Sequence, residues 1–117
     1  MKKKYQRYIE YIVSDLQPPY FINMKEMYGT SEKEYPLVLS KVFNQPVTIK
    51  GNYVYDSNDN EIYSEYSDGY WKKYEYDDNG NIIYHEDSDG YWHKREYNTN
   101  GNIIYFENNT GDIYDIR

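Results

Sequence analysis

The side chains that could act as general acids, bases or ligands are two histidines, His85 and His93, and twenty carboxylates. Neither histidine stands next to a serine or a cysteine. The chain has no cysteine at all. A hydroxyl or thiol nucleophile paired with a histidine is therefore not indicated. We expect both histidines to be ordinary strand residues and the protein not to be an enzyme.

Carboxylates also occur close together at Asp77-Asp78 and at Asp87 and Asp89. Both groups lie among Asn, Ser and Gly residues that predict turns, so turn geometry and hydration explain them. Residues 56–60, Asp-Ser-Asn-Asp-Asn, have the spaced oxygen ligands of a calcium loop. They lack its central glycine and its twelfth-position glutamate. We expect no metal and no other cofactor.

A repeat of 21 residues in the second half of the chain contains both histidines and fifteen of the twenty carboxylates. Its landmarks are Tyr55, Tyr76 and Tyr97; Tyr63, Tyr84 and Tyr105; Glu65, Glu86 and Glu107; and Gly69, Gly90 and Gly111. A period this strict indicates that the repeat is the unit of folding. The surface is then a row of similar patches, which suits binding better than a single reaction.

Each repeat reads as one β-hairpin. Residues 70–77 and 82–87 have strand character, and the Asn-Gly and Asp-Gly segments that follow them predict turns. Successive side chains of a strand point to opposite faces of the sheet. Because the repeat has an odd number of residues, equivalent residues of successive repeats share a face only if one turn of the repeat pairs with even parity and the other with odd parity. We therefore predict a two-residue connection at Asn79-Gly80 and a bulged turn over residues 87–90.

This pairing predicts two aromatic faces. One carries Tyr70, Tyr74, Tyr76, Ile83, Tyr91 and Tyr97, and the other carries Trp71, Ile82, Tyr84, Trp92, Ile103 and Tyr105. Lys73, Glu75, Glu86, Lys94, Glu96 and Glu107 are interleaved with the second set. Two short helices can cover only one face. We expect the other to be left open as an interaction surface.

The N-terminal part predicts two helices. An apolar stripe that includes Ile9, Ile12 and Leu16 predicts a helix over residues 2–17, with a short turn near Asn23. A second helix is expected from residue 31 or 35 to residue 44. A helix-turn-helix is disfavoured, because this second helix has no arginine for base edges. The fold class is α+β, an N-terminal two-helix segment followed by an antiparallel β-meander of hairpin repeats.

We expect a single domain, with residues 1–46 as a helical cap and residues 47–117 as the repeat sheet. The charged residues are also distributed unevenly between the two parts of the chain. Residues 1–50 carry eight Lys or Arg and five Asp or Glu, whereas residues 51–117 carry five and fifteen. An acidic surface of this kind repels nucleic acid and attracts basic surfaces. Without cysteine, and with charges interrupting any N-terminal apolar run, the chain is expected to be cytoplasmic and not membrane-bound.

The motif Tyr-Asp-Asp-Asn-Gly-Asn at residues 76–81, preceded by an aromatic strand and repeated, resembles the tyrosine-aspartate (YD, or RHS-like) repeats of bacterial proteins. It is still more similar to short phage-encoded proteins with tandem Gly-Tyr-Trp and Glu-Tyr-Asp units. The resemblance covers about residues 50–116. It implies a phage protein of the inhibitor class, which includes anti-CRISPR and anti-restriction proteins, acting in the host cell cytoplasm.

The leading hypothesis is a non-enzymatic inhibitor that presents an acidic, aromatic sheet to a basic groove of a host defence protein, such as a CRISPR effector or another nuclease. The expected partner-binding residues are Tyr70, Trp71, Tyr74, Glu75, Tyr76, Asp77, Asp78, Glu86, Asp87, Asp89, Tyr91 and Trp92. The aromatic residues would be anchors, and the acids would supply charge complementarity. No direct contact with nucleic acid is expected.

Two alternatives remain open. Aromatic rows also stack on sugar rings, so the repeats could be a glycan-binding module, for which saccharide would quench Trp fluorescence with little salt dependence. Alternatively, the open face or the last strand, residues 112–116, could pair with another copy to make a homo-oligomer.

Overall fold

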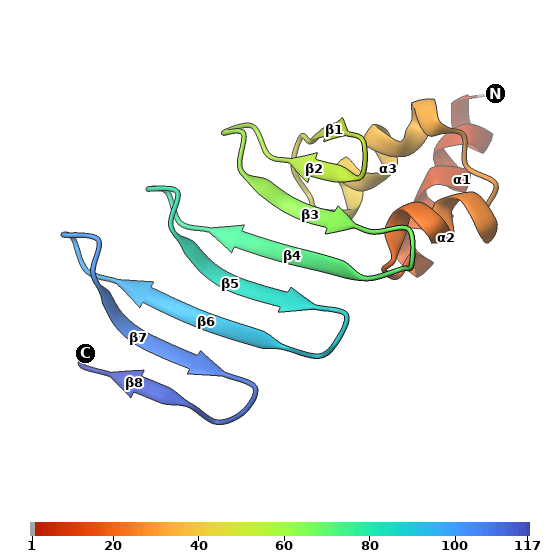
Figure 1. Ribbon diagram of the computed structural model, residues 1–117. Helices are drawn as coiled ribbons and strands as arrows, with labels where there is room; N and C mark the ends of the chain where they lie inside the picture. The colour runs from red at the N-terminus through yellow and green to blue at the C-terminus, as the bar shows by residue number, and fades with distance from the viewer. Residues whose placement is uncertain (1) are drawn as a thin grey trace.

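The computed structural model describes residues 2–117, and side chains from Ile9 onward. The side chains of Tyr5 and Tyr8, which extend the predicted apolar stripe, lie outside the described residues. Three helices precede eight strands, and each strand pairs antiparallel with the next along the chain (Figure 1). The predicted α+β fold with a β-meander is confirmed.

The helical part contains α1 (Lys2–Asp15), α2 (Tyr20–Glu26), the single 3-10 turn η1 (Glu32–Glu34) and α3 (Tyr35–Val42). The strands are β1 (Thr48–Lys50), β2 (Tyr53–Tyr55), β3 (Glu61–Glu65), β4 (Trp71–Tyr76), β5 (Ile82–Asp87), β6 (Trp92–Tyr97), β7 (Ile103–Asn108) and β8 (Ile113–Asp115).

The two predicted helices are present, but α2 replaces the short turn that was expected near Asn23. A helix of seven residues is too short to be stable by itself, so its sequence carries no strong helical signal. Tertiary contacts hold it instead. Tyr20 and Met24 of α2 are buried in the core, where they contact residues of the other helices and of the sheet.

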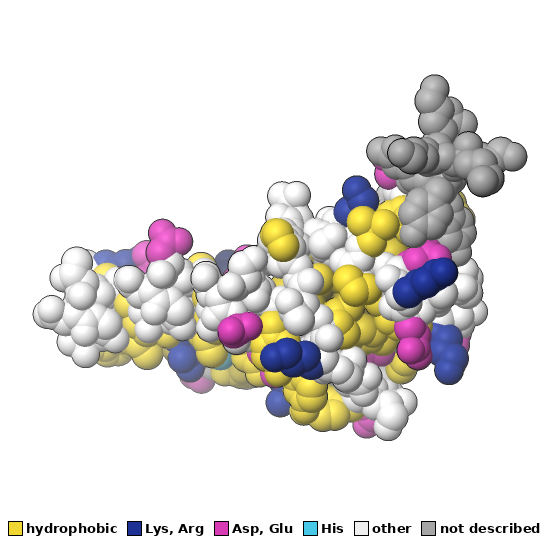
Figure 2. All heavy atoms as spheres, turned by 90° about the horizontal axis from the view of Figure 1, so that it is seen from above, with side chains coloured by type: hydrophobic (Ala, Val, Ile, Leu, Met, Phe, Trp, Pro, Cys, Tyr) yellow, Lys and Arg dark blue, Asp and Glu magenta, His cyan; other side chains and the backbone are white. Residues whose placement is uncertain are grey.

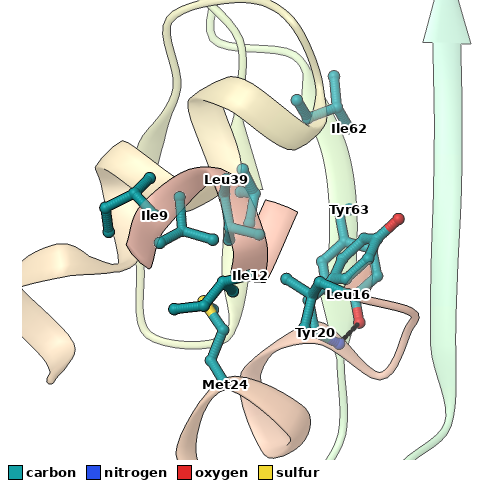
Figure 3. Close-up of a cluster of buried hydrophobic side chains, with 10 residues drawn as sticks. Ile9, Ile12, Leu16, Tyr20, Met24, Leu39, Ile62 and Tyr63 are labelled. Carbon is teal, nitrogen blue, oxygen red and sulfur yellow. Dashed lines mark hydrogen bonds between the residues drawn. The ribbon is translucent and has the colours of Figure 1, made fainter. Parts of the chain in front are cut away.

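The hydrophobic core lies between the helices and the first strands. Its buried members are Ile9, Ile12, Leu16, Tyr20, Met24, Val38, Leu39, Val54, Ile62 and Tyr63. Figure 3 shows the rings of Tyr20 and Tyr63 side by side, next to Leu16. No member of this core comes from β5, β6, β7 or β8. The helices therefore cover only the beginning of the sheet.

Beyond β4 the sheet continues as a single layer, away from the helices (Figure 1). The molecule is elongated, with extents of 55 × 27 × 23 Å. Seen from above in Figure 2, the narrow end carries turn residues and hydrophobic side chains, with acidic and basic side chains on both of its sides. The second half of the repeat array therefore has two open faces rather than the single one expected.

Hairpin turns of one kind join most of the strands. In the turn after β4, the Asp77 N–H donates to the Asn81 carbonyl, and the Asp77 carboxylate accepts the N–H groups of Asn79 and Asn81 at 2.9 Å. The same side-chain geometry recurs at Asp56, Asp87, Asn98 and Asn108. An Asp or Asn at this position thus completes the turn by satisfying two backbone donors.

The predicted two-residue connection at Asn79-Gly80 is wrong. Three residues separate Asp77 from Asn81, because the Asp77 carboxylate stabilises the longer turn, and the turn from Asp87 to Tyr91 has the same length. The irregularity that the odd repeat length requires lies in the strand pairing and not in the turns. Glu75 lies opposite Tyr84, but the next residue, Tyr76, lies opposite Ile82. Ile83 is the extra residue of a β-bulge.

This bulge also corrects the predicted faces. Cross-strand partners share a face, so Ile82 lies on the same face as Tyr76 and not on that of Tyr84. Ile103 likewise lies opposite Tyr97, after the same irregularity in the next hairpin. Ile83, which was predicted on the face of Tyr74, has no cross-strand partner and borders a hollow together with Glu75 and Tyr84. The assignments of the aromatic residues in the strands agree with the pairing. We call the face that carries Trp71, Tyr84, Trp92 and Tyr105 the Trp face, and the face that carries Tyr74, His85, His93 and Phe106 the His face.

Asp59 occupies a turn position that glycine holds in the later repeats. Its φ is 62°, in the left-handed region, and Gly80 has a φ of 82° at the equivalent position. We expect Asp59→Gly to raise the free energy of unfolding by up to about 1 kcal/mol, because glycine has no side chain to disfavour this conformation. Urea denaturation measures the difference. Asp59→Asn is the control, since it removes the charge but keeps the side chain, and equal gains from both variants would contradict the conformational explanation.

Candidate binding site

The candidate site is the open part of the sheet, from β4 to β7. Trp71 and Tyr76 of β4 pack against the core, whereas β5, β6 and β7 contribute no residue to it. On the Trp face, cross-strand pairing builds the row Glu75, Tyr84, Lys94 and Glu107. A shallow hollow of about 480 Å³ lies over this row and is bordered by Ile83, Glu96 and Tyr105. The face thus combines aromatic rings with charges of both signs.

Each tryptophan of the Trp face has a lysine over its ring. The Lys73 ammonium lies 5.2 Å from the centre of the Trp71 ring, and the Lys94 ammonium lies 5.4 Å from that of Trp92. Cations at such distances are attracted to the negative face of the ring. The lysines therefore help to hold the two indoles in place.

The His face is an unbroken series of stacked rings across β4 to β7. Ring centres are 4.7 Å apart for Tyr74 and His85, 5.3 Å for His85 and His93, and 5.7 Å for His93 and Phe106. The Arg95 guanidinium lies 5.9 Å from the Phe106 ring centre. His85 and His93 are buried, although no helix covers them, because the neighbouring rings do. The face is aromatic and cationic, not acidic.

Most of the acidic charge lies at the ends of the hairpins. Asp77 and Asp87 are held by their turns, whereas Asp78 and Asp89 are exposed at the tips. Backbone hydrogen bonds, chiefly from Asn81, lower the pKa of Asp77 below its usual value. The acidic field therefore comes from the two rims of the sheet and from the glutamates of the Trp face.

The predicted partner-binding residues are divided among three regions. The Trp face carries Trp71, Glu75, Glu86 and Trp92. The His face carries Tyr74, and the rings of Tyr76 and Tyr91 contact members of this face. Asp77, Asp78, Asp87 and Asp89 lie in the turns, and the Tyr70 hydroxyl donates to Asp87. The structure therefore brings together a mixed Trp-face set and a separate His-face set rather than one acidic patch.

Some of these side chains have structural contacts that the sequence did not reveal. The Tyr76 hydroxyl donates to the Glu61 carbonyl, and the Tyr97 hydroxyl donates to the Ile82 carbonyl at 2.8 Å. Burial and the Asp87 carboxylate raise the pKa of Tyr70 to about 12. Tyr76 and Tyr97 tie neighbouring strands together, so their conserved spacing within this chain reflects folding as well as surface chemistry.

Sequence reasoning left several side chains of the open sheet out of the predicted site, among them Tyr84, Lys94 and Arg95. Tyr84 and Lys94 face each other across β5 and β6, and Arg95 lies beside the stacked rings of the His face. The 21-residue period already placed Lys94 at the position of Lys73. The period was the signal that could have identified it.

Acidification is expected to destabilise the protein through His93. Burial, together with Arg95 and His85, lowers the pKa of His93 to about 4, and neither ring nitrogen has a hydrogen-bond partner among the described residues. Unfolded histidine titrates near pH 6.5, so the unfolded state binds more protons between pH 6.5 and 4. This contribution to stability is fully present above about pH 6.5 and is lost as the pH falls toward 4.

Urea denaturation at pH 7, 5.5 and 4.5 measures this loss. Carboxylates such as Asp77, whose pKa is also lowered, contribute with the same sign. The matched variant His93→Phe keeps a ring in the stack and removes the titrating group. It should therefore depend less steeply on pH than the wild type, and parallel pH profiles of the two proteins would contradict the assignment to His93.

The described residues contain no group of three or more His, Cys, Asp or Glu side chains placed to hold a metal ion. The segment 56–60 forms a hairpin turn, in which the Asp56 carboxylate accepts the N–H groups of Asn58 and Asn60. From residue 2 to residue 117, no helix is both long and apolar enough to cross a membrane.

No model of a known protein family matches this chain, and no curated protein matches it.

Proposed function

We propose that this protein binds another protein through the open part of its sheet and acts as a non-enzymatic inhibitor. The observation that carries the proposal is the single-layer sheet beyond β4, which exposes aromatic side chains on both faces and has no hydrophobic core of its own. Open aromatic surfaces rimmed by charge are typical of interaction sites. A sheet with such faces is suited to insertion into a groove of a partner.

Charge specifies the kind of partner. Residues 51–117 carry fifteen acidic and five basic side chains, and the exposed acids Glu75, Asp78 and Asp89 lie on the Trp face and on both rims of the sheet. A basic groove is the complementary surface, and long-range attraction would speed its encounter with the sheet. On the strength of the resemblance to short phage proteins, we propose that the target is a host defence protein, such as a nuclease, in the cytoplasm.

Affinity capture tests this proposal. The tagged protein would be incubated with bacterial lysate at low and moderate salt, and the proteins retained would be identified by mass spectrometry. A basic defence protein should be retained at low salt and lost as salt rises. Its enzymatic activity, measured after purification, should fall when the inhibitor is added.

Charge reversal provides the sharper readout. The triple variant Glu75→Lys, Asp78→Lys, Asp89→Lys should weaken binding to the purified target by at least about a hundredfold, because attraction becomes repulsion at three sites. The matched control reverses three exposed acids of the helical part, Glu10, Glu26 and Glu32. Equal affinity of the test variant and the wild type would contradict the proposed mode of binding.

Self-association is a second candidate function, favoured by the edge strand β8. Ile113, Tyr114 and Ile116 are 65%, 49% and 61% exposed beside an unpaired backbone edge. Such an edge is a template for pairing with another strand. Light scattering over a concentration series would show a dimer, and Tyr114→Lys should return it to a monomer if β8 forms the contact.

A further inference from the structure

The first repeat shows how this sheet binds a helix. The backbone N–H of Tyr20, at the start of α2, donates to the Tyr63 hydroxyl at 2.9 Å. The next two N–H groups, those of Phe21 and Ile22, donate to the two carboxylate oxygens of Glu65 at 2.9 Å. A Tyr and a Glu two residues apart on β3 thus satisfy three donors that the first turn of a helix leaves unpaired.

Aromatic and cationic contacts complete this arrangement. The Tyr20 ring lies 4.9 Å from the Tyr63 ring, centre to centre. Figure 3 shows these two rings side by side. The Lys73 ammonium lies over both the Tyr20 ring, at 5.1 Å, and the Trp71 ring, at 5.2 Å. Four sheet residues, Tyr63, Glu65, Trp71 and Lys73, therefore form a platform on which an aromatic residue and the first turn of a helix are seated.

The second repeat contains the same four residue types in the same register. Tyr63 pairs with Lys73 and Glu65 with Trp71, and 21 residues later Tyr84 pairs with Lys94 and Glu86 with Trp92. We call the residues Tyr84, Glu86, Trp92 and Lys94 the second platform. In the third repeat the Tyr and Glu remain, but Ile113 and Asp115 replace the Trp and the Lys. Only the second platform repeats the complete set.

No helix occupies the second platform. Tyr84 and Glu86 border a hollow of about 300 Å³, whose other wall is formed by Tyr20, Val42 and Phe43 of the helical part. Tyr84 and Glu86 are only partly buried, and no hydrogen bond to the Tyr84 hydroxyl is found within the described part of the chain. The Lys73 ammonium is 4.0 Å from the Glu86 carboxylate, a partly exposed pair that contributes little.

We propose that the second platform binds the first turn of a helix in the partner protein, with an aromatic residue at the start of that helix. Glu86 would accept the unpaired N–H groups of the turn, the Tyr84 hydroxyl would accept one more, and the aromatic ring would pack between Tyr84 and the Lys94 ammonium. This inference rests on the proposed binding function and names the structural element that is bound.

The chain itself supplies the probe. A peptide of residues 16–28, acetylated and amidated, contains the Pro-Pro-Tyr-Phe-Ile segment that the first platform already holds. It would be titrated to millimolar concentration into the full-length ¹⁵N-labelled protein. We expect saturable shifts of the backbone signals of Tyr84, Glu86 and Lys94 and of the Trp92 indole signal, and none for a peptide with alanine in place of Tyr20 and Phe21.

Variants test the role of the carboxylate. Glu86→Gln keeps the size of the side chain but removes the charge that strengthens its hydrogen bonds, so peptide affinity should fall about tenfold. Glu10→Gln is the control, because it removes one negative charge from the exposed surface of α1, away from the second platform. Absence of shifts at millimolar peptide, shifts confined to Tyr63 and Glu65, or equal affinity of the Glu86→Gln protein would each overturn the proposal.

These outcomes are separate from those for the proposed function. If a defence protein is captured but the peptide does not bind the second platform, the inhibitor proposal stands and the helix-binding inference is rejected. If the peptide binds and no defence protein is captured, the platform is retained and the identity of the target is rejected.

Discussion

Tyr63→Ala should lower the free energy of unfolding by about 3–5 kcal/mol, the usual cost of deleting a large buried ring. Tyr63 is completely buried and contacts the rings of Tyr20, Phe43 and Trp71. Its hydroxyl also links the Tyr20 N–H to the Glu65 carboxylate. The substitution therefore leaves a cavity at the junction of the helices and the sheet, together with unpaired polar groups.

Two further variants divide this loss of stability into its causes. One separates the contribution of the Tyr63 ring from that of its hydroxyl, and the other compares a tyrosine at the same position of the next repeat. Tyr63→Phe keeps the ring and should cost about 1–3 kcal/mol, the penalty for leaving buried hydrogen-bonding groups unpaired. Tyr84→Ala, at the same position of the next repeat, should cost only about 1 kcal/mol, because Tyr84 stays partly exposed. Urea denaturation gives all three values. Equal losses for Tyr63→Ala and Tyr84→Ala would contradict a core confined to the helical end.

The second large effect is expected for Glu65→Ala, which should cost about 2–4 kcal/mol because several buried donors lose their acceptor. Glu65 is only 3% exposed, and its carboxylate accepts hydrogen bonds from the N–H groups of Phe21 and Ile22 and from the Tyr63 hydroxyl. Without it the N–H groups of Phe21 and Ile22 have no acceptor, and a helix of seven residues does not persist unaided.

Hydrogen exchange makes this prediction specific. In Glu65→Ala the amides of Phe21 and Ile22 should exchange much faster than in the wild type, while amides of β6 and β7 should keep their protection. The matched control Glu86→Ala should change stability by no more than about 0.5 kcal/mol, because Glu86 holds no helix in this chain. Uniform loss of protection in both variants would show that Glu65 acts on the whole fold and not through α2.

The hairpin array could be predicted because its signals are local. Most turns depend on an Asp or Asn side chain five residues before the next strand and on a residue with positive φ two residues before it. These residues recur every 21 positions. The apolar stripe Ile9, Ile12 and Leu16 predicted α1 and its buried face for the same reason. Local hydrogen bonding and periodic burial can be read directly from the order of residues.

The β-bulge at Ile83 could not be predicted in this way. The parity argument required one irregularity in each repeat, but a two-residue turn and a bulged strand satisfy it equally well. The choice depends on whether the Asp77 carboxylate closes the three-residue turn, and that contact joins the two residues that flank the turn, Asp77 and Asn81, only once the strands are paired. Consequently the faces of Ile82 and Ile103 were predicted wrongly, while those of the tyrosines and tryptophans were correct.

The predicted binding residues likewise could be identified by type from the sequence, but their arrangement could not. Their types and spacing established an aromatic and acidic repeat surface, but strand pairing separated them into the Trp face, the His face and the turns. The stacking of His85 on Tyr74 and His93 depends on residues from three strands. No spacing within one strand reveals such a stack, because its members come together only when the register of two hairpins is set.

By itself, the sequence determined the repeat unit, the hairpins, the α+β class and the uneven distribution of charge, since these follow from residue order and composition. Only the tertiary structure decided which copy of the repeat carries the core. Tyr63 and Tyr84 are the same residue in the same position, yet one is completely buried and the other partly exposed. The physical reason is that burial depends on what packs against a residue, and a single short helical segment can cover only the first repeat.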